Sequence, residues 1–152
     1  VEDSLVSTAG LLSGIAVVDT PRATIFLTGI VLIFVEAFSM AAGSFLSEYS
    51  TEDYLEKRDV PLKKPLRGSL VMFLSYFLSG FIPITPYIFL KTELAFGVSI
   101  IASLFALFCL SLISARISKI RAPKVISRML LVGGIAIMVG IIIGKLASSF
   151  NL

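Results

Sequence analysis

Long apolar runs constrain the fold of this chain more than any other feature. They cover residues 5–18, 23–46, 68–90, 94–115 and 129–150, and only short charged or proline-containing stretches separate them. With 57% hydrophobic and 15% charged residues and a mean hydropathy of +0.99, the composition is too apolar for a water-soluble domain of 152 residues. Since a helix needs about 20 apolar residues to cross a bilayer, the runs predict an all-α, multi-pass membrane protein with five transmembrane helices in one domain.

The expected helices cover about residues 1–18, 23–47, 67–90, 93–116 and 125–148, and a cytosolic linker covers 48–66. The first run is short. Because the sequence begins at Val1 rather than at a methionine, we interpret this run as a helix cut on its N-terminal side. Pro83 and Pro86 are expected to kink or end the third helix.

Lysine and arginine are unevenly distributed over the expected loops. Ten lie on the side of the N-terminus, in the second-to-third and fourth-to-fifth connections, whereas three lie on the opposite side. The positive-inside rule therefore places the N-terminus in the cytosol and the C-terminus outside the cell or in an organelle lumen. A prokaryotic cell membrane and a vacuolar membrane both fit this orientation.

The residue inventory excludes several function classes. The chain has no histidine and one cysteine, Cys109, so it lacks the usual zinc and copper ligands, the usual general base and any intramolecular disulfide. It contains no HExxH motif, and its net charge of +3 is too small for a nucleic-acid surface. We therefore expect no enzyme, no permanently bound cofactor and no nucleic-acid partner.

Glu36 is the only acidic residue in the apolar run 23–46 and lies close to its centre. At 1.5 Å rise per residue, it is roughly 2 Å from the middle of the membrane. A charge at that depth costs about 3 kcal/mol, so Glu36 should face protein rather than lipid. It is either part of an ion or proton site, or a protonated side chain hydrogen-bonded to a neighbouring helix.

Small and polar residues follow Glu36 at helical spacing, and the same spacing recurs in the first helix. An antiparallel hairpin turning at residues 20 and 21 sets Asp3 level with position 38, between Glu36 and Met40. Met40 as a mere packing residue is the alternative. The predicted metal site comprises Asp3, Glu36 and Met40, and the predicted lining of its pathway comprises Ser7, Gly43 and Ser47.

The ligand set suggests which ion such a site takes. Carboxylates alone favour hard cations, whereas an added thioether without imidazole or thiolate favours Fe²⁺ or Mn²⁺ over Ca²⁺ or Zn²⁺. Two ionised carboxylates close together in a medium of low dielectric constant repel one another. Entry of a cation should therefore release protons, which predicts exchange of a divalent metal for protons.

Acidic residues also recur at helical spacing in the expected linker, at Glu48, Glu52 and Glu56. Like charges four residues apart destabilise a helix by a few tenths of a kcal/mol, and a bound cation would relieve that repulsion. These residues are a candidate cytosolic mouth for the metal pathway. The alternative is a solvated extension of the second helix, partly balanced by Asp53 and Lys57.

Motifs in all five expected helices resemble the vacuolar iron transporter family. They are DSLVST at residues 3–8, SMAAGSFLS at 39–47, GFIPITPY at 80–87, the segment 107–116 and MLLVGG at 129–134. The resemblance implies a five-helix protomer, a homodimer with its pathway along the first two helices, and export of Fe²⁺ or Mn²⁺ from the cytosol against protons. Asp3 and Met40 match residues that the family uses for transport.

The chain departs from that family's pattern in three places. Ser4 stands where the family usually has glycine, and the family's intramembrane glutamate aligns near Leu32, one turn before Glu36. Only about 20 residues join the second and third helices, where many members insert a cytosolic metal-binding bundle. The sequence therefore resembles a short-form metal transporter embedded in lipid. A non-transporting membrane scaffold or assembly subunit and a metal-free proton channel are the alternatives.

Overall fold

The computed structural model describes residues 1–56 and 62–150, except the side chains of residues 52, 53, 55 and 56. Within these residues the chain is all-α, with helices α1 (Glu2–Ala16), α2 (Arg22–Glu56), α3 (Lys63–Phe89), α4 (Thr92–Ser118) and α5 (Ala122–Ser149). Four of them, α2 to α5, are long and apolar enough to cross a membrane. Because α1 has only 15 residues, the predicted count of five spans is not confirmed.

The second and third helices extend further than the sequence pattern indicates. α2 continues to Glu56, well past the expected end at 47, and α3 begins at Lys63 instead of 67. The polar segment after residue 47 is therefore helical, and α2 extends beyond its apolar part.

Both prolines of the third apolar run lie inside α3, which continues to Phe89. Pro83 and Pro86 therefore do not end the helix where they stand. A hydroxyl from α4 stabilises this part of α3, because Ser99 donates a hydrogen bond of 2.7 Å to the carbonyl of Pro83. This hydrogen bond ties α4 to the proline-containing part of α3.

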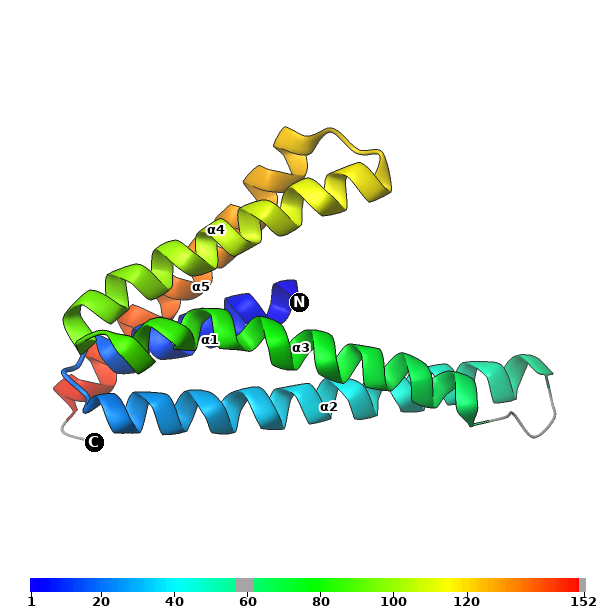
Figure 1. Cartoon of the computed structure of the whole chain (residues 1–152), viewed down its shortest axis with the longest axis horizontal. Helices are drawn as coiled ribbons and strands as arrows, with labels where there is room; N and C mark the ends of the chain where they lie inside the picture. Colours follow the sequence, from blue (N-terminus) through cyan, green and yellow to red (C-terminus); the bar gives the residue numbers. More distant parts are fainter. Residues whose placement is uncertain (57–61, 151–152) are drawn as a thin grey trace.

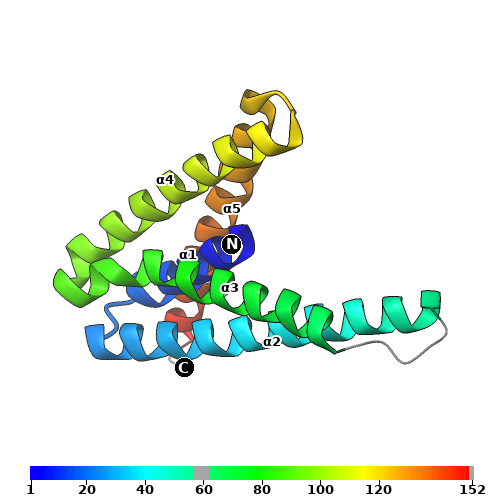
Figure 2. The ribbon, with the colours of Figure 1, turned by 45° about the vertical axis from the view of Figure 1, so that its right-hand side comes forward.

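The helices form two arms that diverge from a common end (Figures 1 and 2). α2 and α3 run side by side as one long hairpin, and α4 and α5 form the other. α1 lies between the arms, with the N-terminus in the fork, and it contacts each of the four other helices. The shortest helix is therefore the centre of the molecule.

Glycines let α1 and α5 approach at the distance of backbone contact. A Cβ atom on Gly14 would lie 2.6 Å from the carbonyl oxygen of Gly140. A Cβ on Gly140 would overlap the carbonyl of Gly10, and one on Gly144 would overlap that of Gly14. The small residues at i, i+4 spacing on both helices thus form a tight crossing of the kind common in membranes.

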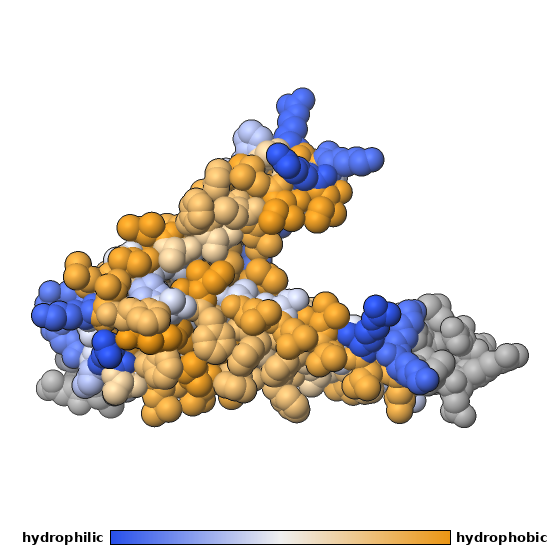
Figure 3. Space-filling view, in the orientation of Figure 1, coloured by the Kyte–Doolittle hydropathy of each residue, from blue (hydrophilic) through white to orange (hydrophobic). Residues whose placement is uncertain are grey.

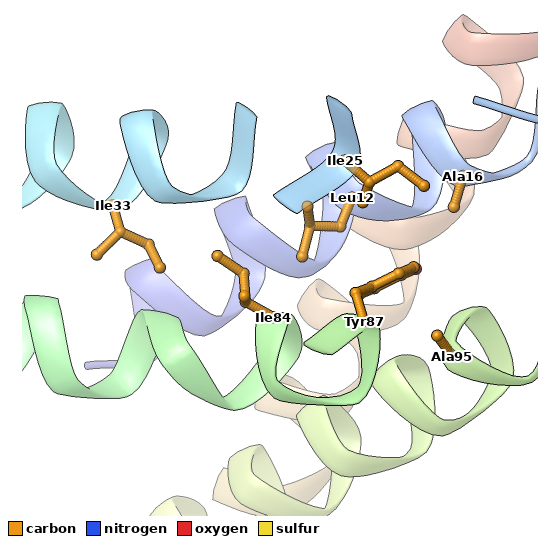
Figure 4. Close-up of a cluster of buried hydrophobic side chains, with 7 residues drawn as sticks. All are labelled: Leu12, Ala16, Ile25, Ile33, Ile84, Tyr87 and Ala95. Atoms are coloured by element: carbon orange, nitrogen blue, oxygen red, sulfur yellow. The ribbon is translucent and has the colours of Figure 1, made fainter. Parts of the chain in front are cut away.

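Large apolar side chains are distributed between a compact core and an extensive outer surface. The core cluster gathers one or more residues from each of α1 to α4, as Figure 4 shows: Leu12, Ala16, Ile25, Ile33, Ile84, Tyr87 and Ala95. Outside it, the surface of both arms is mostly hydrophobic, and hydrophilic residues gather at the ends of the arms (Figure 3). Such a surface suits lipid on the outside.

Candidate functional site

The hydroxyl of Tyr76 lies between the two carboxylates predicted from the sequence. It is 2.9 Å from Oδ2 of Asp3 and 3.2 Å from Oε2 of Glu36. The same Glu36 oxygen accepts a hydrogen bond of 2.8 Å from the hydroxyl of Ser7. Asp3 and Glu36 thus meet, together with Ser7, around a tyrosine on a third helix.

Three helices supply the members of this cluster: α1 carries Asp3 and Ser7, α2 carries Glu36 and α3 carries Tyr76. Asp3 lies in the first turn of α1, where the helix dipole stabilises a negative charge, and Glu36 lies within the apolar part of α2. The backbone of α3 is tied to α1 at Tyr76, because the buried hydroxyl of Ser4 donates a 2.8 Å hydrogen bond to the Tyr76 carbonyl. A glycine at position 4 could not make this bond between α1 and α3.

The exposure of the side chains differs across the cluster. Tyr76 is 2% exposed, Ser7 and Glu36 are half-buried, and Asp3 is exposed. The carboxylate pair is therefore anchored on the protein side by Tyr76 and exposed on the side of Asp3.

The number of protons limits how this cluster is bonded. A tyrosine hydroxyl carries one proton, so it donates to only one of the two carboxylates at a time. If the tyrosine donates to one carboxylate, its oxygen also lies close to an oxygen of the other carboxyl group. That second approach is favourable when the other carboxyl group is protonated and donates to the tyrosine oxygen. The geometry therefore places one hydroxyl proton between two carboxyl groups.

The remaining residues predicted for the pathway lie further along α2. Met40, Gly43, Ser47 and Glu48 line a groove of about 690 Å³ between α2 and α3. Glu36 does not line this groove. Met40, which does, lies one helical turn from Glu36. The side chains of Glu52 and Glu56 are outside the described residues, so only Glu48 of the predicted mouth has a described position.

A second groove of about 850 Å³ follows the crossing of α1 and α5. Glycines on both helices line it, and Ser7 lies in its wall as well. Ser7 therefore belongs both to this groove and to the carboxylate cluster.

Within the described part of the chain, no three acidic, cysteine or histidine side chains converge on one point. A cation held at Asp3 and Glu36 would have two carboxylates and two hydroxyl groups as neighbours, with water to complete its coordination. Hard and borderline divalent ions accept such oxygen-rich surroundings.

Sequence reasoning missed Tyr76, because a tyrosine in an apolar run is usually a packing residue. Depth in the membrane could have identified it. If the second and third helices are antiparallel, the hydroxyl of Tyr76 can lie near the level of Glu36. The hydrogen bonds of Tyr76 join residues 73 and 40 positions apart in the sequence, which local spacing does not reveal.

Comparison with known proteins assigns the family. The model of the VIT family matches two segments, residues 1–61 and 55–145, which together span almost the entire chain. Vacuolar iron transporter homolog 4 of Arabidopsis thaliana is 29% identical over 161 residues, covering 99% of this chain and 81% of the relative. Vacuolar iron transporter homolog 1 of the same plant is 28% identical, covering 99% of this chain and 80% of the relative. With a family match of this length on a helical membrane fold, the chain belongs to the VIT family.

Proposed function

We propose that this chain transports Fe²⁺ out of the cytosol in exchange for protons, with Asp3 and Glu36 as the carboxylates that alternately hold metal and proton. Iron is favoured because the curated relatives are named vacuolar iron transporter homologs. Mn²⁺ is the second candidate substrate, since the same oxygen and thioether ligands accept it.

The single observation that carries this proposal is the position of the Tyr76 hydroxyl between the two carboxylates. Without metal, one shared proton satisfies the hydrogen bonds and reduces the repulsion between Asp3 and Glu36. A divalent cation supplies that positive charge instead, so its binding displaces the proton. Such mutual exclusion at one site is the physical basis of exchange.

The proposed orientation has the N-terminus in the cytosol, following the distribution of lysine and arginine. Exchange then moves metal toward the outside or the lumen. The proposed working unit is a homodimer in the lipid bilayer. The exposure of Asp3 and the small-residue groove along α1 and α5 support it, since both are available to a second copy. The mass of the solubilised particle tests the dimer.

Reconstitution in liposomes tests the exchange. With a metal-sensitive dye inside and a pH gradient across the membrane, we expect gradient-driven uptake of Fe²⁺ that is abolished by Glu36→Gln. Met40→Ala should change the preference between Fe²⁺ and Mn²⁺. Glu93→Gln is the matched control, because it neutralises an exposed glutamate in the first turn of α4, and it should leave uptake unchanged.

Two results would contradict the proposal in different ways. Fe²⁺ uptake that is unchanged in Glu36→Gln would show that the carboxylate pair is not needed for transport. Well-folded protein that moves protons without metal would indicate a proton channel, whereas the absence of any flux would favour the scaffold alternative.

A further inference from the structure

The groove between α2 and α3 is lined by residues that lie one helical turn from the carboxylate cluster on both helices. On α2, Met40 follows Glu36 by four residues, and on α3, Met72 precedes Tyr76 by four residues. The helices are antiparallel, and Tyr76 is hydrogen-bonded to Glu36. The two methionines therefore lie one turn beyond the cluster, on the same side of it.

Both methionines line the groove. Met40 is 36% exposed and Met72 is half-buried, so neither is enclosed as a core methionine is. Gly43, one turn further along α2, has no atom within 4 Å of the place where a Cβ would stand. The wall of the groove at Gly43 is therefore open.

A carboxylate lies at the next level of the same groove. Oε2 of Glu48 would be 2.6 Å from a Cβ atom on Gly68, so the glutamate of α2 reaches across the backbone of α3 because position 68 is glycine. Gly68 precedes Met72 by four residues, which puts the carboxylate one turn from the thioether on α3. Lys64 also lines the groove, and its ammonium charge opposes a cation there.

We propose that this groove is a loading site, in which the thioethers of Met40 and Met72, with the carboxylate of Glu48, bind Fe²⁺ before the ion passes to Asp3 and Glu36. This inference rests on the proposed function. Thioether sulfur is a soft ligand and favours Fe²⁺ over the harder Mn²⁺, so the groove selects the metal while the carboxylate pair exchanges it for protons. Met72 is the residue that distinguishes this site from the one predicted by the sequence.

Anaerobic Fe²⁺ binding to the full chain in lipid nanodiscs tests the loading site. Equilibrium dialysis measures affinity, and X-ray absorption at the iron edge detects sulfur ligands. We expect a sulfur shell in the unmodified protein, and an affinity for that ion about tenfold or more weaker in Met72→Leu, since even outer partners of a metal are worth 10- to 100-fold. Leucine preserves volume, and Met138→Leu, at an exposed position on α5, is the matched control that should change nothing.

One further variant sharpens the test. Gly68→Ala should weaken Fe²⁺ binding in the groove by displacing the Glu48 carboxylate. In liposomes, Met72→Leu should lower the ratio of Fe²⁺ to Mn²⁺ uptake several-fold. Glu36→Gln should abolish uptake but retain the sulfur-bound ion.

The failures of the two proposals are separable. A protein that transports Fe²⁺ but binds it with oxygen ligands only would overturn the loading site and leave the exchange mechanism standing. Unchanged affinity and metal preference in Met72→Leu would do the same. Absence of both Fe²⁺ binding and Fe²⁺ transport in the unmodified protein would overturn the proposed function and the loading site together.

Discussion

α1 and α2 are consecutive helices with opposite surroundings: α1 is mostly buried, whereas much of α2 is exposed. α1 has 15 residues, and nine of them, mostly Gly, Ala, Ser and Thr, are buried. α2 has 35 residues, and many of its large apolar side chains, including Phe34, Val35 and Phe38, are exposed. In lipid there is little to gain from burying large apolar groups, so small residues make the interior and large ones the exterior.

The comparison also explains why polar contacts gather where the two helices meet. Buried polar groups are costly in a membrane unless they are bonded, and α1 supplies hydroxyl groups that bond to its neighbours. Ser4 donates to the backbone of α3, and Ser7 donates to Glu36 of α2. The central helix thus provides partners for the acidic residue in the apolar part of α2.

A large loss of stability is expected from a side chain added where α1 touches α5. Gly140→Ala places a Cβ on the carbonyl of Gly10, so the helices must separate, at a cost of about 3 kcal/mol. Thermal unfolding in detergent should show a much lower midpoint. Gly134→Ala on the same helix is the control, since no atom lies within 4 Å of its Cβ position. Equal midpoints for the two variants would contradict the close crossing.

Truncating one large side chain on each helix tests the contrast directly. Leu12 of α1 is fully buried and Phe38 of α2 is 71% exposed. Leu12→Ala should lower the free energy of unfolding by about 2–5 kcal/mol, while Phe38→Ala should change it by less than about 0.5 kcal/mol. Denaturant titration in micelles measures both. A larger loss for Phe38→Ala would indicate that this face of α2 is covered by protein.

The contact between the two regions can be weakened without altering either helix. Tyr76→Phe removes the hydroxyl shared by Asp3 and Glu36, and a hydrogen bond to a charged group is worth about 1.5–3 kcal/mol. We expect metal-for-proton exchange to fall about 10- to 100-fold. Tyr87→Phe is the matched control, because Tyr87 lies on the same helix but belongs to the hydrophobic core cluster instead of the carboxylate cluster. Wild-type exchange in Tyr76→Phe would exclude the shared proton.

The smallest effect concerns α4, which resembles α1 in its buried serines. Ser99→Ala removes the bond to the Pro83 carbonyl and should cost about 0.6 kcal/mol, the average for polar contacts between membrane helices. Ser127→Ala, where the hydroxyl is exposed and bonds within its own helix, should be neutral. The two thermal midpoints provide the test, and no difference between them would mean that the proline region does not need the hydroxyl.

The closeness of Asp3 and Glu36 was predictable because it depends on quantities that act along a helix. The rise per residue set the depth of Glu36, and the position of the turn set Asp3 at nearly the same level, where the structure finds the two carboxylates on one hydroxyl. The linker assigned to residues 48–66 is helical as far as Glu56, which agrees with the alternative of a solvated extension of the second helix, because the charged residues after 47 favour a loop or a helix equally well.

The sequence alone determined that the chain is helical and membrane-embedded, since apolar run length and composition decide both. Only the tertiary structure decided that the shortest helix is central, that Tyr76 joins Asp3 to Glu36, and that Met72 faces the groove of Met40. The reason is geometric: periodicity describes each helix about its own axis, whereas the choice of neighbours around the bundle depends on where glycines permit close approach and where hydroxyl groups find partners.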